Sequence, residues 1–303
     1  MKKVIIILAG LFLINCNNIA QHLFPVYSQY MLNGLALNPA YAGSRDALNI
    51  SAGYRNQWVG FEGAPVSQTF STHTPLRNRN IALGLLVFNE KIDVRNNLSI
   101  FTNYAWRFNA GRGRLAFGLK GGLTIRNANW NELNVHDPGD ISFTESSQDI
   151  IPNFGFGIYY HTNHFFAGAS IPMFLSDSLS NGKVSVYHDP KNYNYLFTSG
   201  IVLGNQGFRI KPSLLIKYDR ENPLQVDANL SFIFGNFLWV GGSYRIEDVV
   251  VGLVKFQIND QLRIGYTYDH SLGTLNKYNN GSHEIMLIYD FIYRGRAVNP
   301  RYF

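Results

Sequence analysis

Apolar and polar residues alternate along most of this chain in segments of roughly ten residues, starting near Ala47. Successive side chains of a strand point to opposite faces, so each segment would present one apolar face and one small or polar face. In the clearest segment the apolar positions are Leu115, Phe117, Leu119, Leu123 and Ile125, and the others are Ala116, Gly118, Lys120, Gly122 and Thr124. Repeated segments of this kind predict a transmembrane β-barrel, with lipid on one face and a lumen on the other.

Two later segments alternate in the same way but carry charges on the face that is not apolar. In residues 208–219 that face holds Arg209, Lys211, Lys217 and Asp219, and in residues 262–269 it holds Arg263 and Asp269. A soluble β-sandwich also alternates, with its polar face in water and its apolar face in a core. Alternation alone therefore leaves both all-β classes open.

The number of segments favours the barrel. We read fourteen strands, at residues 47–58, 66–75, 81–89, 96–108, 114–126, 153–160, 163–170, 194–203, 208–219, 224–235, 238–245, 249–257, 261–269 and 283–292. Single-chain bacterial barrels have an even number of antiparallel strands, which places both chain ends on the same side of the membrane.

The connections between these segments differ in length according to their position. Every connection after an even-numbered strand is short: residues 76–80, 109–113, 161–162, 204–207, 236–237 and 258–260. The long connections, 127–152, 171–193 and 270–282, all follow odd-numbered strands. Short periplasmic turns and longer outer loops are typical of outer-membrane barrels. We therefore expect a barrel at 47–292 in the bacterial outer membrane, with periplasmic ends.

The first twenty residues have the features of a secretory signal peptide. Lys2 and Lys3 precede the apolar run Val4–Ile14, and Ala20 is a small residue at a cleavage point. That run is about half the length that a transmembrane helix needs, and no later run is long enough, so no transmembrane helix is expected.

The ends of the chain divide into three expected parts outside the barrel. We expect a signal peptide at 1–20, a periplasmic N-terminal segment at 21–46 and a periplasmic tail at 293–303. The alternative to cleavage after Ala20 is lipidation at Cys16, the single cysteine, although the preceding Asn15 fits a lipoprotein signal poorly. Cleavage after Ala20 would leave no thiol in the exported chain.

The composition indicates an apolar environment around the chain. Aromatic residues make up 15% and charged residues only 15%, whereas the charged fraction of soluble proteins is about a quarter. Removal of Lys2 and Lys3 lowers the count of Lys and Arg from 26 to 24 against 20 Asp and Glu, leaving a charge of +4. A balance this mild, without a Lys- and Arg-rich helix, gives no indication of nucleic-acid binding.

No motif assembles a catalytic, metal or cofactor site. His161 and His164 flank a tight turn, and no Cys or carboxylate stands beside them to complete a metal site. Ser282-His283-Glu284 offers the residue types of a hydrolase, and a phospholipase can be a barrel, but a Gly-x-Ser-x-Gly elbow is absent. We therefore predict a protein without enzymatic activity, metal or cofactor.

Glycines and charges within the predicted strands have structural interpretations. Gly111, Gly113, Gly118 and Gly122 are typical of bends and close packing, since none of them links a strand to a helix N-terminus as in a phosphate loop. The charged residues on predicted lumen faces are Arg107, Lys120, Arg209, Lys211, Lys217, Asp219, Asp227 and Arg263. They would either tune an open pore or pair across a narrow lumen and close it, and both alternatives stay open.

Several sequence blocks are specific when taken together. They are Ser28-Gln29-Tyr30-Met31, Asn33, Asn38-Pro39-Ala40-Tyr41-Ala42-Gly43-Ser44-Arg45 and Tyr54-Arg55-Asn56-Gln57-Trp58-Val59-Gly60-Phe61. Further matches are Gly63-Ala64-Pro65, Gln68-Thr69, His73, Lys211-Pro212-Ser213, Ser282-His283-Glu284-Ile285 and Pro300-Arg301-Tyr302-Phe303. With these blocks the chain resembles the PorP/SprF family, outer-membrane proteins of the type IX secretion system of Bacteroidota, over nearly its whole mature length. Asn299 departs from the family pattern, which often has Ser there.

The resemblance implies a barrel without enzymatic activity that contacts outer-membrane lipid. It also implies periplasmic type IX partners, such as peptidoglycan-linked or ring lipoproteins, and a role in exporting or anchoring a surface protein such as a large adhesin of gliding motility. A passive outer-membrane porin is the alternative function.

The stretch 29–43 is rich in Asn, Pro, Tyr and Gly and suits neither a helix nor a strand. Its backbone must therefore be satisfied by packing into the barrel mouth or onto a partner. The candidate partner-binding or plug residues are Gln29, Tyr30, Asn33, Asn38, Pro39, Tyr41, Arg55, Gln57, Trp58, Arg301, Tyr302 and Phe303. A C-terminal aromatic residue also serves barrel insertion, which is the expected role of Phe303.

Overall fold

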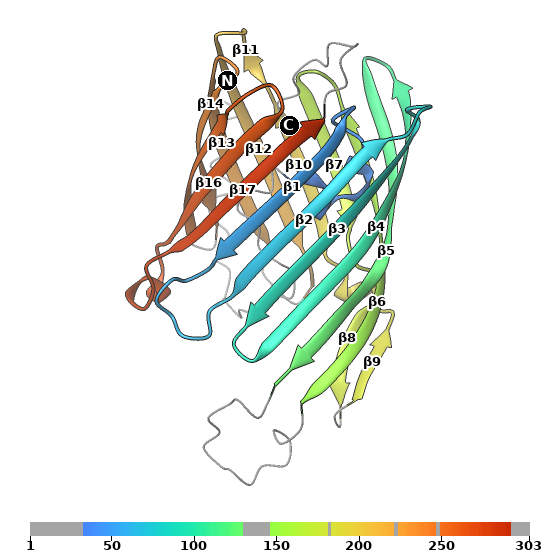
Figure 1. Ribbon diagram of the computed structural model, residues 1–303, viewed down its shortest axis with the longest axis vertical. Coiled ribbons are helices and arrows are strands. Elements are labelled where there is room, and N and C mark those ends of the chain that lie inside the picture. The colour runs from blue at the N-terminus through green and yellow to red at the C-terminus, as the bar shows by residue number, and fades with distance from the viewer. Residues whose placement is uncertain (1–32, 130–145, 181–182, 221–223, 247–248, 292–303) are drawn as a thin grey trace.

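The computed structural model describes residues 33–129, 146–180, 183–220, 224–246 and 249–291, and in them a sheet of antiparallel strands closes into a barrel (Figure 1). Fourteen strands form the wall, as the sequence predicts. Two pairings complete the ring: β1 with β17, and β10 with β12. In the described part of the chain, no helix has the length and apolar character needed to cross a membrane.

The strands of the wall agree with most of the predicted ranges to within a few residues. They are β1 Leu48–Asn56, β2 Val66–Pro75, β3 Ile81–Ile92, β4 Arg95–Ala110, β5 Gly113–Ala128, β6 Ser147–His161, β7 Phe165–Ile171, β10 Tyr195–Ile201 with its continuation β11 Leu203–Gly204, β12 Phe208–Tyr218, β13 Gln225–Phe234, β14 Leu238–Arg245, β15 Val249–Gln257, β16 Leu262–Ser271 and β17 Ser282–Phe291. The other elements are α2 Gly34–Leu37, η2 Pro39–Tyr41, the hairpin β8 Ser176–Ser180 and β9 Lys183–Tyr187, η5 Pro190–Asn192 and η6 Thr274–Lys277.

The faces of the strands follow the predicted alternation. On β5, Leu119 is 59% exposed on the outer surface, whereas its neighbour Lys120 is only 5% exposed and faces the lumen. On β12, Arg209 and Lys211 are buried, while Phe208 is exposed. Because exposed Phe, Leu, Ile, Val, Tyr and Trp side chains recur around the wall, lipid can solvate the outer surface.

The two rims of the barrel differ in their connections. Leu48 at the start of β1 pairs with Phe291 at the end of β17, so both strands meet at one rim, here called the turn rim. Its connections are all short: residues 76–80, 111–112, 162–164, 205–207, 235–237 and 258–261. The opposite rim, here called the loop rim, carries the longer connections, and the β8–β9 hairpin lies beyond it (Figure 1).

The expected connection 127–152 is wrong at both ends, because β5 runs to Ala128 and β6 begins at Ser147. Pro152 suggests a break in the sequence, since proline cannot donate a ladder hydrogen bond. Here β6 pairs with β5 along its full length but with β7 only from Phe156 onward. Phe154, of the same parity as Pro152, donates its N–H to the Asn153 side chain, and its carbonyl accepts from the N–H of Phe174 at 2.8 Å. The missing N–H of Pro152 therefore lies on the side of β6 that β7 does not reach.

The connection predicted at 171–193 contains a structure that the alternation analysis missed. Residues Ser176–Ser180 and Lys183–Tyr187 pair as a two-stranded hairpin outside the barrel. The sequence between them, Asn181-Gly182, is a strong hairpin signal. Each strand is only five residues long, which is too short for the ten-residue pattern that identified the wall.

Candidate functional site

Residues 33–46, here called the lumen segment, lie inside the barrel and do not join its sheet (Figure 1). The segment contains one turn of α-helix, α2, followed by the 3-10 turn η2. Its residues from Asn33 to Ser44 are buried with the exception of Gly34, which is intermediate. The stretch that suited neither helix nor strand is therefore satisfied within the barrel.

Asn38 and Pro39 determine how the lumen segment turns. A residue before proline is driven out of the helical region, and Asn38 is extended, with φ −142° and ψ 116°, so α2 ends there. The Asn38 side-chain oxygen accepts a hydrogen bond from the N–H of Ala40 at 2.9 Å, which caps η2. Pro39 occupies the first position of η2, where its missing N–H costs nothing.

The same Asn38 side chain fixes the turn to the barrel wall. Its Nδ2 donates to the carbonyl oxygens of Ile158 at 2.9 Å and Ala169 at 3.3 Å, which are paired residues of β6 and β7. The Ser170 hydroxyl donates to the Leu37 carbonyl at 2.7 Å. These bonds satisfy polar groups of Leu37, Asn38 and Ser170 that are buried inside the barrel.

Glycines on the wall make room for this turn. A Cβ on Gly118 would lie 2.1 Å from the Ala40 nitrogen, and one on Gly157 would lie 2.0 Å from the Asn38 side-chain oxygen. Gly168 on β7 approaches Asn38 Nδ2 in the same manner, at 2.9 Å. Close packing is therefore the reason for glycine at position 118, as the sequence analysis proposed for its motif.

Tyr41 packs against aromatic rings from two parts of the wall. Its ring centroid is 5.5 Å from that of His73 and 5.4 Å from that of Tyr159, both in edge arrangements. Gly43, with φ +72°, turns the chain so that its N–H donates to Nδ1 of His73 at 3.1 Å. This bond makes His73 Nδ1 an acceptor.

Apolar contacts fill the space around the lumen segment in two clusters. Leu35, Ala40, Tyr41 and Ala42 pack with Ala82, Ala105, Ala116, Tyr159, Phe166 and Val202. Ala36 and Leu37 pack with Leu86, Phe88, Phe101, Leu196 and Leu215. Three of the six wall residues around the η2 turn are alanines, which leaves room for the larger side chains of the segment.

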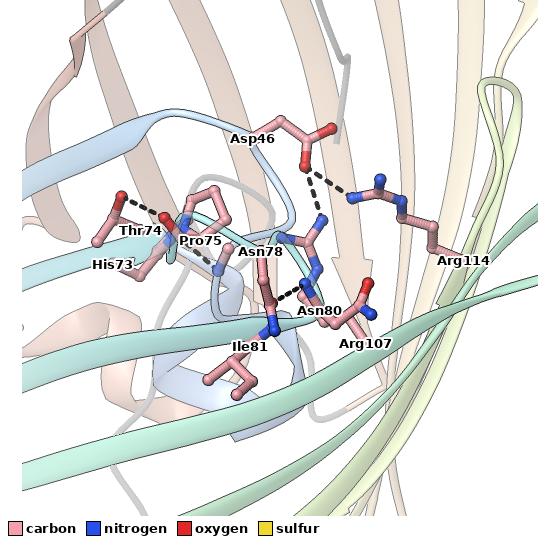
Figure 2. Close-up of polar contacts among 10 residues, drawn as sticks. Asp46, His73, Thr74, Pro75, Asn78, Asn80, Ile81, Arg107 and Arg114 are labelled. Carbon is pink, nitrogen blue, oxygen red and sulfur yellow. Dashed lines mark hydrogen bonds and ion pairs between the residues drawn. The ribbon is translucent and has the colours of Figure 1, made fainter.

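Two consecutive residues fasten the end of the lumen segment to separated parts of the wall. Arg45 forms an ion pair with Asp290 of β17 at 2.9 Å, and Asp290 also binds Arg263 of β16. Asp46 accepts from Arg107 of β4 at 2.7 Å and Arg114 of β5 at 3.1 Å (Figure 2). The chain then enters β1 between these two anchors, which favours one position of the segment.

Arg55 lies near the loop rim, at the other end of β1 from Asp46. Its guanidinium binds Asp269 at 2.9 Å and Glu284 at 3.2 Å, and all three side chains are buried. Gln57 donates its N–H to the Pro65 carbonyl at 3.0 Å, and Trp58 donates its N–H to Ser282 Oγ at 3.1 Å.

The candidate residues thus fall into three groups. Asn33, Asn38, Pro39 and Tyr41 gather in the lumen segment, with Asn33 accepting from the Ser71 hydroxyl. Arg55, Gln57 and Trp58 lie at the loop-rim end of β1. Gln29, Tyr30, Arg301, Tyr302 and Phe303 lie outside the described residues. Sequence reasoning missed Asp46, Asp290 and Ser170 as partners, because their contacts join strands far apart in the chain.

Charged lumen residues form pairs with neighbours or stack on rings. Asp227 binds Arg245 at 2.9 Å, and Arg263 binds Asp290. The Lys120 ammonium lies 4.0 Å from the Phe101 ring centroid, and Lys255 lies 3.9 Å from that of Trp239. These contacts join adjacent strands of the wall and do not cross the lumen, so neither alternative, an open pore or a lumen closed by pairing across it, is decided by them.

The motifs tested for chemistry do not converge. His161 is buried in the lumen, whereas His164 is exposed in the turn after β6. His283 bonds to the Tyr266 hydroxyl on the outer face, whereas Glu284 faces the lumen and binds Arg55. Within the described ranges, no three His, Cys, Asp or Glu residues are grouped so that they could share a metal ion.

Replacing Gly118 with alanine tests the fit of the lumen segment. The added Cβ meets backbone at η2, so the Gly118→Ala barrel should unfold in urea with about 1–3 kcal/mol less stability. Gly121→Ala is the matched control on the same strand, because its Cβ meets nothing within 4 Å and should change stability by less than about 0.5 kcal/mol. Equal stability of the two variants would contradict the packing described here.

Replacing Arg55 tests the ion pairs near the loop rim. Arg55→Ala leaves Asp269 and Glu284 without this cation, and breaking a buried pair costs about 3–5 kcal/mol. Arg55→Lys keeps the charge but loses the planar guanidinium that binds both carboxylates, so its loss of stability should lie between those of wild type and Arg55→Ala. Arg95→Ala, an exposed position at the same rim, serves as control. A loss below about 1 kcal/mol for Arg55→Ala, as at an exposed pair, would refute a buried role.

Comparisons with known proteins agree with this architecture. A solved monoaromatic hydrocarbon channel, CymD, is similar over 90% of this chain and 95% of its own, with 12% identity and a TM-score of 0.50. The Acinetobacter baumannii outer membrane protein Omp33 is similar over 81% of this chain and 98% of its own, with 8% identity and a TM-score of 0.48. Such low identities show the fold alone. A comparison with individually curated proteins gives no match.

The family comparison is more specific than the fold. The model of the type IX secretion system membrane protein PorP/SprF matches residues 20–289, which includes the lumen segment and nearly all of the barrel. The family match, together with the closed barrel of strands, places the protein in the outer membrane. The chain therefore belongs to the PorP/SprF family of type IX secretion system membrane proteins.

Proposed function

We propose that this outer-membrane component of the type IX secretion system acts as a scaffold without enzymatic activity. It would link periplasmic secretion components to the export or surface anchoring of a partner protein, such as a large adhesin. The protein would do so by binding partners at its rims, and its own lumen would not be the route of transport.

The observation that carries this proposal is the position of the lumen segment. Asn38 bonds to β6 and β7, Arg45 to β17, and Asp46 to β4 and β5, so one short segment is tied to three sectors of the wall. A solute pathway would have to cross the same space. A passive porin, the alternative function, would need this segment to leave or to sit beside an open path.

The two rims support an orientation for the scaffold. The turn rim has only short connections and receives the start of β1 and the end of β17, as periplasmic rims of bacterial barrels do. We therefore assign the turn rim, with the anchors Arg45 and Asp46, to the periplasmic side. The β8–β9 hairpin and the loop-rim connections would then face the cell exterior.

The division of candidate residues follows from burial. Asn33, Asn38, Pro39 and Tyr41 are buried inside the barrel, so we assign them to the plug and not to a partner surface. Arg55 serves the barrel wall through its two ion pairs. Docking of periplasmic components is left to the turn rim and to Gln29, Tyr30, Arg301, Tyr302 and Phe303. The signal peptide at 1–20 and the tail at 293–303 are part of this proposal.

Conductance in planar bilayers distinguishes the scaffold from the porin. The wild-type protein and Gly121→Ala should give no sustained conductance, since the lumen segment stays in place. A variant combining Gly118→Ala and Gly157→Ala, which places two methyl groups against the η2 turn, should show frequent channel openings. Steady wild-type conductance of porin size would favour the passive pore.

A pull-down tests the partners independently. Tagged wild-type protein, extracted in mild detergent from its native outer membrane, should bring down periplasmic type IX components or a large surface protein. Deletion of the gene should remove a specific protein from the cell surface, and Gly121→Ala should restore it. A protein that comes out alone and whose loss leaves the surface proteins unchanged would contradict the scaffold.

A further inference from the structure

The charges on the turn rim are unevenly distributed. The turn 76–80, between β2 and β3, carries Arg77 and Arg79, and the turn 111–112, between β4 and β5, carries Arg112. The four other turns of this rim, 162–164, 205–207, 235–237 and 258–261, contain one formally charged residue, Asp260. One sector of the rim is therefore cationic.

Hydrogen bonds fix the backbone of the first of these turns, which carries Arg77 and Arg79. The Asn78 side chain accepts from the N–H groups of Asn80 at 2.7 Å and Ile81 at 3.2 Å (Figure 2). The Arg107 N–H donates to the Asn80 carbonyl at 2.6 Å, which ties the turn to β4. Arg79 adopts φ +56°, a conformation that glycine tolerates far better than arginine.

The carboxylate of Asp46 is already bound by two other arginines, from β4 and β5. Asp46 binds Arg107 and Arg114, whose side chains face the lumen side of β4 and β5. Arg77, Arg79 and Arg112 are exposed, and none has an ion pair with another residue in the described part of the chain. Their positive charges are therefore available to an anionic group outside the barrel.

A continuous aromatic array lies on the outer wall directly beside the two turns. Trp106 is 50% exposed, and its ring centroid lies 4.9 Å from Phe108 and 6.4 Å from Phe117. Phe117 in turn lies 6.4 Å from Phe156 of β6. Because Ile81, the residue after the first turn, pairs with Trp106, the array begins within a residue or two of the arginines. Exposed aromatic rings at the end of a barrel wall mark the level of lipid headgroups.

We propose that this sector is a binding site for an anionic glycerophospholipid of the adjacent leaflet. The guanidinium groups of Arg77, Arg79 and Arg112 bind the phosphate and the anionic headgroup, since arginine pairs with phosphate through two parallel hydrogen bonds. The acyl chains pack along Trp106, Phe108, Phe117 and Phe156. A lipid fits better than an acidic soluble protein because the three arginines lie directly beside the lipid-facing aromatic rings. A lipid can therefore contact the cations with its headgroup and the rings with its acyl chains.

The expected gain is set by the number of cations. Each arginine near an anionic surface contributes about a fivefold gain in affinity, so three contribute on the order of 100-fold for anionic over zwitterionic lipid. The gain should fall as salt is added, because exposed charges are screened.

Native mass spectrometry of the detergent-purified barrel, with added phosphatidylglycerol or phosphatidylcholine, tests the site. Wild type should retain phosphatidylglycerol preferentially, and a variant with Arg77→Gln, Arg79→Gly and Arg112→Gln should lose most of that preference. Glycine at position 79 also relieves the backbone strain, so this variant should unfold at the same urea concentration or higher without lipid. Loss of lipid binding together with loss of the fold would overturn the assignment to these side chains.

A matched control and a soluble probe complete the experiment. Lys91→Gln, Lys191→Gln and Lys277→Gln together remove three exposed cations from the loop rim and should leave the preference unchanged. Inorganic phosphate at the same concentration should not displace the lipid, since it lacks acyl chains. Equal phosphatidylglycerol retention by wild type and the turn-rim variant, or an equal loss in the loop-rim control, would overturn the proposal.

Discussion

The structure of the barrel interior depends on how a buried chain segment outside the sheet satisfies its backbone polar groups. A strand in a closed barrel finds partners on both sides, but residues 33–46 have no ladder to join. The Asn38 side chain makes three of the required hydrogen bonds: it accepts from the Ala40 N–H, which caps the following turn, and it donates to carbonyls of β6 and β7. Gly118 and Gly157 are the corresponding adaptation of the wall, because any larger residue would exclude the turn.

The wall itself was largely predictable from the sequence, and the reason is its period of two. Lys120 between Leu119 and Gly121, or Arg209 between Phe208 and Ile210, can face only one way once lipid surrounds the barrel. The errors came where a local signal and its context disagree. Pro152 suggests the end of a connection but lies within β6, outside the part that pairs with β7, and the β8–β9 strands were too short for the pattern.

The site was predictable only in part. The asparagine, proline and tyrosine of the opening stretch indicated a segment without regular structure, and the choice between partner surface and barrel mouth stayed open. Its partners were beyond reach, because Asn38 meets Ile158 and Ala169, and Arg45 meets Asp290, across more than a hundred positions. Arg55 had been grouped with the same site, yet it serves a separate set of ion pairs at the other rim.

Taken together, the interior and the exterior of the barrel have different tasks. The interior holds a segment in place through shape, hydrogen bonds and ion pairs, and this arrangement suits a secretion component that works through contacts at its rims. The exterior matches the membrane, with aromatic rings at lipid level and arginines beside them at the turn rim. In the proposed scaffold, the lumen segment would fix the structure of the turn rim through Arg45 and Asp46, and this rim would face the periplasm.

The most direct test of the account is the accessibility of a cysteine placed at Ala36, in a chain whose Cys16 is replaced by Ser. Ala36 is 3% exposed and packs among residues of the second lumen cluster. The account predicts that a charged, water-soluble maleimide leaves this thiol unmodified in the folded barrel and modifies it fully after unfolding, while a cysteine at the exposed Asn78 reacts in both states. Rapid modification of Ala36→Cys in the folded barrel would show that the segment does not occupy the lumen, and would contradict the central claim.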